Sequence, residues 1–172
     1  GTFQRGWIFG FGYFVGAINW ILEPFLIDAA RHAWMAPFAL AFIAGGLAVF
    51  WGVGAKLSQL LGNNTYSMAL GLGIVELIRG YIFTGFPWNN FSHSLAVNEN
   101  LMQIFSLTGQ YLATFFLILI SQFLLFFWKE KGYFKAFILI SILPAIFLYG
   151  SIRIKDNEFI DNNLIGVVQP NI

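Results

Sequence analysis

The chain has 172 residues, of which 58 % are hydrophobic and only 10 % charged, with a mean hydropathy of +0.73. A soluble domain of this size could not bury so much apolar surface in one core, so the composition predicts an integral membrane protein. A net charge of +1 gives no basis for nucleic-acid binding, and the absence of cysteine excludes disulfides, thiolate metal sites and a cysteine nucleophile within these residues.

Five apolar stretches follow one another along the chain and predict transmembrane helices. They cover residues 6–22, 34–53, 66–83, 104–128 and 134–150. Each can cross a hydrocarbon core of about 30 Å, and each must be helical because every backbone N–H and C=O in lipid needs an internal partner. The sequence therefore predicts an all-α, polytopic transmembrane bundle of about five spans. Pro144 is expected to kink the last helix without ending it.

The first stretch carries glycines on two nearly opposite helix faces. Gly6 and Gly10 share one face, and Gly12 and Gly16 share the other. Each pair has the GxxxG spacing that lets a neighbouring helix approach closely, which predicts a helix packed between two others. The alternative is that glycine is simply frequent in transmembrane helices, and in either case these residues serve packing.

The six tryptophans fall near the ends of the predicted spans. They are Trp7, Trp20, Trp34, Trp51, Trp88 and Trp128. An amphipathic indole ring is favoured at the boundary between water and lipid, so we predict that all six lie at such boundaries.

The distribution of Lys and Arg predicts the orientation in the membrane. One side of the predicted bundle has five basic residues: Arg5, Lys56, Lys129, Lys131 and Lys135. The other side has three basic residues, which are Arg31, Arg153 and Lys155. It also has most of the acidic residues. The side richer in Lys and Arg is expected to be cytoplasmic. The amino end is then cytoplasmic, and the 83–100 loop and the carboxyl tail are periplasmic.

Two charged residues lie within the third predicted span. Glu76 and Arg79 are three residues apart, so a helix places them on one face where they can pair. A charge inside the membrane costs about 2.5–3.5 kcal/mol even on insertion scales, so it needs a bundle interior or a polar cavity. Two interpretations remain open: a buried ion pair that fixes the helix register, or a polar cavity in which Arg79 meets a lipid phosphate.

The segment TGFPWNN follows this pair, and its Gly85 and Pro87 interrupt the helix. We interpret His93, a little further on, as a solvated loop residue rather than a base, because no carboxylate partners it. No second His and no Cys accompanies it, so we predict no metal, no cofactor and no catalytic residue. The sequence predicts an outward-facing lipid mouth made by Glu76, Arg79, Gly85, Phe86, Pro87, Trp88, Asn89 and His93.

Three motifs resemble segments of one known family, the bacterial apolipoprotein N-acyltransferases. They are GFGYFVGAINWI from residue 10, ELIRGYIFTGFPWNNF from residue 76 and IGVVQPNI from residue 165. They occur in the order found in the family, and the second is the most specific because its Glu and Arg precede TGFPW.

The resemblance implies an inner-membrane enzyme of about eight spans with a periplasmic nitrilase-like domain that carries a Glu-Lys-Cys triad. Its substrates would be a phospholipid acyl donor and a lipoprotein whose N-terminal diacylglyceryl-cysteine accepts the acyl chain. This chain resembles spans three to seven. Residues 1–163 are therefore predicted to form the membrane domain, and 164–172 the first strand of the nitrilase-like domain. A start at Gly1 without a signal peptide is interpreted as truncated, and a chain without cysteine is expected to be inactive alone.

Two other classes of function remain as alternatives. The first is a non-enzymatic membrane anchor or lipid-binding module that acts with a separate partner. The second is part of a transporter, which would be expected to show an internal repeat. No second copy of the Glu-x-x-Arg or TGFPW pattern occurs in the chain, which counts against a transporter.

Overall fold

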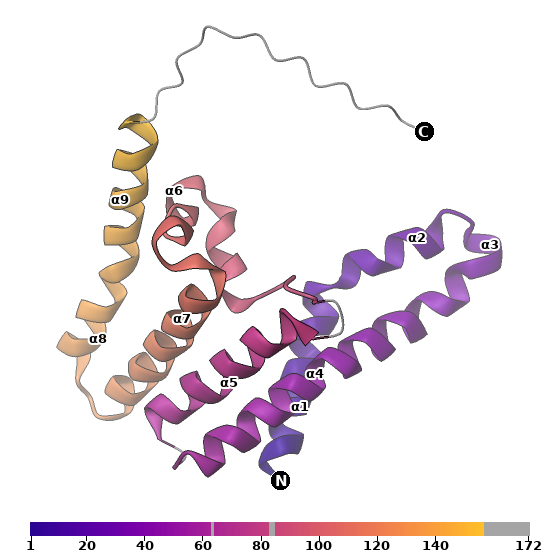
Figure 1. Cartoon of the computed structure of the whole chain (residues 1–172), viewed down its shortest axis with the longest axis horizontal. Coiled ribbons are helices and arrows are strands. Elements are labelled where there is room, and N and C mark those ends of the chain that lie inside the picture. Colours follow the sequence, from indigo (N-terminus) through magenta and orange to yellow (C-terminus); the bar gives the residue numbers. More distant parts are fainter. Residues whose placement is uncertain (63, 83–84, 157–172) are drawn as a thin grey trace, which may run out of the picture.

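The computed structural model describes residues 1–62, 64–82 and 85–156, and every regular element in these residues is helical. The longer helices are α1 (Thr2–Ala17), α4 (Ala36–Leu60), α5 (Thr65–Arg79), α7 (Phe105–Lys129), α8 (Tyr133–Ile140) and α9 (Ile142–Asp156). Shorter helical turns connect them: η1 (Asn19–Leu22), α2 (Glu23–Leu26), α3 (Ala29–His32), η2 (Ala33–Met35), η4 (Phe91–Val97) and α6 (Glu99–Met102). Figure 1 shows α5 between α4 and α7, with α8 and α9 beyond α7.

Three segments of the described chain are long and apolar enough to cross a membrane. They are Ala29–Leu60, Phe105–Lys129 and Tyr133–Lys155. A fourth span is present if Thr2–Ala17 and Asn19–Leu26, which meet at a bend of 61°, act as one. The all-helical membrane fold is confirmed, whereas five spans are not shown.

The third predicted span differs most from the structure. Residues 66–83 were expected to cross the membrane, but α5 has only 15 residues. A helix of that length rises about 22 Å, which is short of a hydrocarbon core of about 30 Å. The helix ends at Arg79 because the following residues turn back, so that the carbonyls of Phe86 and Trp88 accept hydrogen bonds from the Arg79 side chain.

The last span is interrupted but continues. Ser141 alone separates α8 from α9, and Pro144 lies in the first turn of α9. The absence of a proline N–H costs little there, because the first N–H groups of a helix have no intrahelical partner. The two helices together form the third candidate span, so Pro144 does not end the span, as predicted.

One glycine face of α1 packs closely on α4. A Cβ atom at Gly10 would lie 2.9 Å from Cβ of Trp51, and one at Gly6 would lie 2.5 Å from Cβ of Ala55. Both positions therefore need glycine for the close approach that the sequence predicts. A Cβ at Gly12 would meet no described atom within 4 Å, so only one of the two predicted packed faces is shown.

The core lies where α1, α4, α5 and α7 meet. Its buried members are Phe14, Ile18, Ala44, Ala48, Trp51, Ala69, Leu72, Val75 and Ile118. The predicted boundary position of Trp51 is wrong, because its side chain is 2 % exposed and α4 continues for nine residues beyond it. The helix extends past the predicted end at residue 53 because Gly54, Ala55 and Ser58 are also buried.

Candidate functional site

The predicted pair of charged residues forms at the end of α5. Glu76 and Arg79 are each 1 % exposed. Nη2 of Arg79 donates to Oε2 of Glu76 at 2.5 Å, and Nε donates to Oε1 at 3.2 Å. The guanidinium fork thus meets both carboxylate oxygens, which is the geometry that Arg offers and Lys does not.

A third residue, which the sequence did not reveal, completes the pair. The indole N–H of Trp51 on α4 donates to Oε1 of Glu76 at 2.7 Å. This bond joins α4 to α5 inside the core, and it explains why the ring of Trp51 is buried rather than placed at a boundary. No local spacing connects residue 51 with residue 76, so only the packing of the two helices brings them together.

Arg79 also holds the loop that follows α5. Its Nη1 donates to the carbonyl oxygens of Phe86 at 2.7 Å and Trp88 at 2.9 Å. Its Nη2 donates to Oδ1 of Asn90 at 2.8 Å. We call these contacts, together with the two bonds to Glu76, the Arg79 clamp.

The clamp uses the whole donor capacity of the arginine. A guanidinium has five N–H groups, and the five bonds of the clamp account for all of them. Of the two interpretations left open for the pair, this arrangement favours the buried ion pair over contact of Arg79 with a lipid phosphate, because all five N–H groups have partners. Arg79 shapes the loop instead.

The loop itself has a backbone that its sequence favours. Gly85 has φ +85°, and a Cβ there would lie 2.5 Å from the carbonyl oxygen of Gly80, so both the conformation and the space require glycine. Asn89 has φ 55°, which Asn tolerates better than most residues. Its Nδ2 donates to the carbonyl of Ala17, and its own carbonyl accepts from the hydroxyl of Tyr13, each at 3.1 Å. The end of α1 therefore supports the loop from the side opposite Arg79.

The loop exposes one large side chain. Trp88 is 61 % exposed, although its carbonyl is held by Arg79. Phe86 and Pro87 beside it are half-buried. The amide Nδ2 of Asn90 is buried and has no partner among the described residues.

Polar contacts attach η4 to α7. Oγ of Ser92 donates to the carbonyl of Gln110 at 2.9 Å, and Oγ1 of Thr114 donates to Oγ of Ser92 at 3.0 Å. Nε2 of His93 lies 3.1 Å from Oε1 of Gln110. The prediction of His93 as a solvated loop residue is corrected, because it is half-buried and linked to α7. α7 is itself interrupted nearby at Gly109, which has φ 63°.

An apolar cleft begins under η4 and runs between α7 and α9. Its volume is about 310 Å³. Leu95 of η4 and Ile104 border it at the loop end, and Ile120 lies furthest along α7, while α9 contributes Ile142 and Ile146. Within the described parts of the chain, no three His, Asp or Glu side chains lie together in a group that could hold a metal.

Comparison with known proteins decides the family. Residues 1–123 match the domain described as Apolipoprotein N-acyltransferase N-terminal domain. The chain belongs to the apolipoprotein N-acyltransferase family. The resemblance carried by the motifs is thus confirmed, and the Arg79 clamp, the loop and η4 all lie inside the matched domain.

Individual apolipoprotein N-acyltransferases agree with this assignment. The protein of that name from Rhodopseudomonas palustris is 34 % identical over 180 residues, which cover 98 % of this chain and 34 % of that protein. The one from Rickettsia bellii is also 34 % identical, over 98 % of this chain and 35 % of its own length. The one from Caulobacter vibrioides is 39 % identical over 70 % of this chain and 23 % of its own length. No solved structure matches.

The chain therefore spans about a third or less of these apolipoprotein N-acyltransferases. It is the membrane N-terminal part of an acyltransferase, a multi-pass bundle that contains no cysteine. The strand predicted at 164–172 and the end of the predicted membrane domain at 163 lie outside the described residues.

Proposed function

We propose that this domain receives a phospholipid acyl donor at the 85–93 loop and presents it for transfer to the N-terminal diacylglyceryl-cysteine of a lipoprotein. The observation that carries the proposal is the Arg79 clamp, which fixes the loop backbone while leaving the Trp88 indole exposed. A rigid loop with an exposed amphipathic ring is suited to the headgroup region of a membrane, where indole rings are favoured.

The predicted lipid mouth then divides into two groups of residues with different roles. Glu76 and Arg79 are buried and shape the mouth without contacting lipid. The segment Gly85–Asn89 and His93 form its wall. Trp88 is the wall residue that we expect to contact the lipid most directly, because it is the most exposed of them.

The apolar cleft between α7 and α9 offers a place for an acyl chain of the same lipid. It starts under η4, whose first residues form the end of the 85–93 loop, and its lining is almost entirely aliphatic and aromatic. It extends along α7 as far as Ile120, and the uninterrupted helix from Gln110 to Ile120 rises about 15 Å in the direction in which an acyl chain enters a membrane. A chain placed there would have its ester group near the loop.

The chemical step itself is assigned outside these residues. The family resemblance implies a thioester on a cysteine, and the 172 residues contain none. The domain supplies binding and orientation of the lipid. We also propose that the lysine-rich side faces the cytoplasm, so that the mouth opens to the periplasm.

A photo-crosslinking experiment tests lipid binding on the chain as it is. The purified chain is placed in vesicles that contain a phospholipid with a diazirine near the glycerol end of one acyl chain, and labelled peptides are identified by mass spectrometry. Labelling concentrated on 85–93 and on the cleft residues of α7 is expected. Phe42 on α4 is 84 % exposed and serves as the control for general contact with lipid. Equal labelling of Phe42 and the loop would refute the mouth.

A chimera tests the link to acyl transfer. The matching segment of the Rhodopseudomonas palustris relative is replaced by this chain, and acylation of a diacylglyceryl peptide is measured. Trp88→Ala is expected to lower acyl transfer at unchanged thermal stability, since the side chain is mostly exposed. Unchanged transfer would favour the alternative of an anchor that takes no part in lipid handling. The purified chain without the chimera is expected to give no acylated product.

A further inference from the structure

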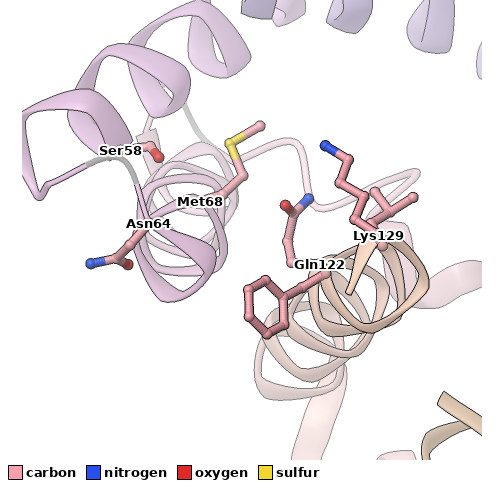
Figure 2. Close-up of a pocket in the computed structure, with 7 residues that line it drawn as sticks. Ser58, Asn64, Met68, Gln122 and Lys129 are labelled. Atoms are coloured by element: carbon pink, nitrogen blue, oxygen red, sulfur yellow. The ribbon is translucent and has the colours of Figure 1, made fainter. Parts of the chain in front are cut away.

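A second, polar pocket lies at the other end of α5 and α7, far from the mouth. It has a volume of about 310 Å³ and is bordered by Ser58, Met68, Gln122, Leu125 and Lys129, among others. Figure 2 shows Gln122 and Lys129 on the α7 side of the opening, and Met68 and Ser58 across from them. We propose that this pocket binds an anionic phospholipid of the membrane, with the lipid phosphate against the Lys129 amine.

Two of the polar residues that line the pocket, Lys129 and Gln122, are placed to bind a ligand, whereas Ser58 and Asn64 are bonded to Ser67. Lys129 is exposed and Gln122 is half-buried. Neither the Lys129 amine nor the Gln122 amide makes a hydrogen bond or ion pair with another described residue. The two residues are seven apart, so they share one face of α7. An ammonium and an amide on one face are donors that suit phosphate oxygens.

Two other lysines at the same end already have partners. Lys56 donates to Oε1 of Gln59 at 3.0 Å, and the Lys135 amine lies 5.5 Å from the centre of the Phe127 ring. Lys129 therefore differs from these neighbours in having both a pocket beside it and no recorded partner. Its position in the last turn of α7 also complements the helix dipole, but that role leaves its N–H groups available.

The apolar side of the pocket fits a lipid rather than a free anion. Met68, Leu125 and Phe126 line it, and Leu125 and Phe126 are 59 % and 45 % exposed. Lys129 is the last residue of a candidate span, which places its amine at headgroup level with these apolar side chains below it. A phosphate joined to acyl chains can use both parts of the site at once.

The charge of this end of the bundle selects among lipids. Lys56, Lys129, Lys131 and Lys135 gather here, because the end of α4, the end of α7 and the start of α8 lie on the same side of the bundle (Figure 1). An anionic headgroup is attracted by this charge, whereas the ammonium of a zwitterionic headgroup is repelled by it. Basic pockets between transmembrane helices on the cytoplasmic side are known to hold anionic lipids.

Binding of defined lipids to the purified chain tests the proposal. Phosphatidylglycerol and phosphatidylcholine with identical acyl chains are titrated into the detergent-solubilised chain, and bound lipid is counted by native mass spectrometry. We expect tighter binding of phosphatidylglycerol. Lys129→Gln should weaken it about tenfold or more, because it removes a charged hydrogen-bond donor to the phosphate as well as a surface charge. The matched control Lys135→Gln removes only a surface charge from the same end and should weaken binding no more than about fivefold.

Three results would overturn the site. Equal effects of Lys129→Gln and Lys135→Gln would show attraction to the surface charge alone. Equal binding of the two lipids would show no recognition of the anion. Displacement by inorganic phosphate at concentrations near those of the lipid would show a site for any phosphate. Circular dichroism of both variants checks that they fold, and a failure here leaves the mouth at the opposite end of α5 untouched.

Discussion

Replacing Arg79 by Lys tests whether the Arg79 clamp holds the loop. Lysine keeps the positive charge beside Glu76 but offers a compact ammonium with three donors instead of a planar fork with five. It cannot reach the carboxylate and the carbonyls of Phe86 and Trp88 together. We therefore expect the helices to stay folded while the loop loses its fixed shape.

The magnitude follows from the bonds that are lost. Each hydrogen bond from a charged donor contributes about 1.5–3 kcal/mol, and at least two such bonds to the loop are removed. Even the lower value gives about 3 kcal/mol in favour of the open loop, which corresponds to roughly a hundredfold increase in its opening equilibrium.

Amide hydrogen exchange measures this opening directly. The amides of Phe86, Ser92 and His93 have acceptors in the structure, on Arg79, Thr114 and Asn90 respectively. Their exchange should accelerate by roughly a hundredfold in Arg79→Lys. The exchange of amides in the middle of α4 should not change. Arg153→Lys is the matched control, since that arginine lies on α9 and contacts Gln103. Unchanged exchange of the loop amides in Arg79→Lys would refute the clamp.

Three further predictions concern the rest of the bundle. Trp51→Phe removes one donor from the buried carboxylate and should lower stability by about 1.5–3 kcal/mol in thermal unfolding; no loss would show that the indole bond is dispensable. Gly6→Leu should destabilise the chain by about 1–3 kcal/mol through overpacking against α4, whereas Gly12→Leu should change little, and equal effects would contradict the one-sided packing of α1. In intact spheroplasts an impermeant maleimide should label a cysteine placed at Ser94 but not one at Lys131, and the reverse pattern would invert the proposed orientation.

The charged pair shows what a local pattern can predict. Glu76 and Arg79 are one helical turn apart, and the cost of an unpaired charge in a membrane leaves few arrangements other than pairing. The family motif around them was equally visible in the sequence. Both inferences depend on residues that are close in the chain, and both are confirmed.

The partners of the pair show what the sequence could not reveal. Trp51 and Asn90 reach the pair from 25 and 11 residues away, through the packing of α4 and through a turn with a left-handed residue at Asn89. The apolar composition also did not predict where the helices end. The predicted span ends at residue 53, whereas α4 continues to Leu60, with the small residues Gly54, Ala55 and Ser58 buried.

The short length of α5 has a similar explanation. Composition alone extends the apolar stretch to residue 83, while the structure ends the helix at Arg79. The side chain of Arg79 needs acceptors, and it finds three of them by folding the following residues back over the helix end. The requirements of one side chain thus override the hydropathy of the stretch.

The bond from Trp51 to Glu76 makes the loop dependent on a helix that it does not follow in the chain. The indole holds the carboxylate, the carboxylate orients the guanidinium, and the guanidinium holds the loop carbonyls. If residues 76–91 were transferred into another membrane bundle, the motif sequence would be kept but the loop would not adopt the same conformation, unless an indole donor to Glu76 was transferred as well. Moving the loop intact would require α4 and α5 together with the end of α1, which bonds to Asn89, and with α7, which bonds to Ser92 of η4.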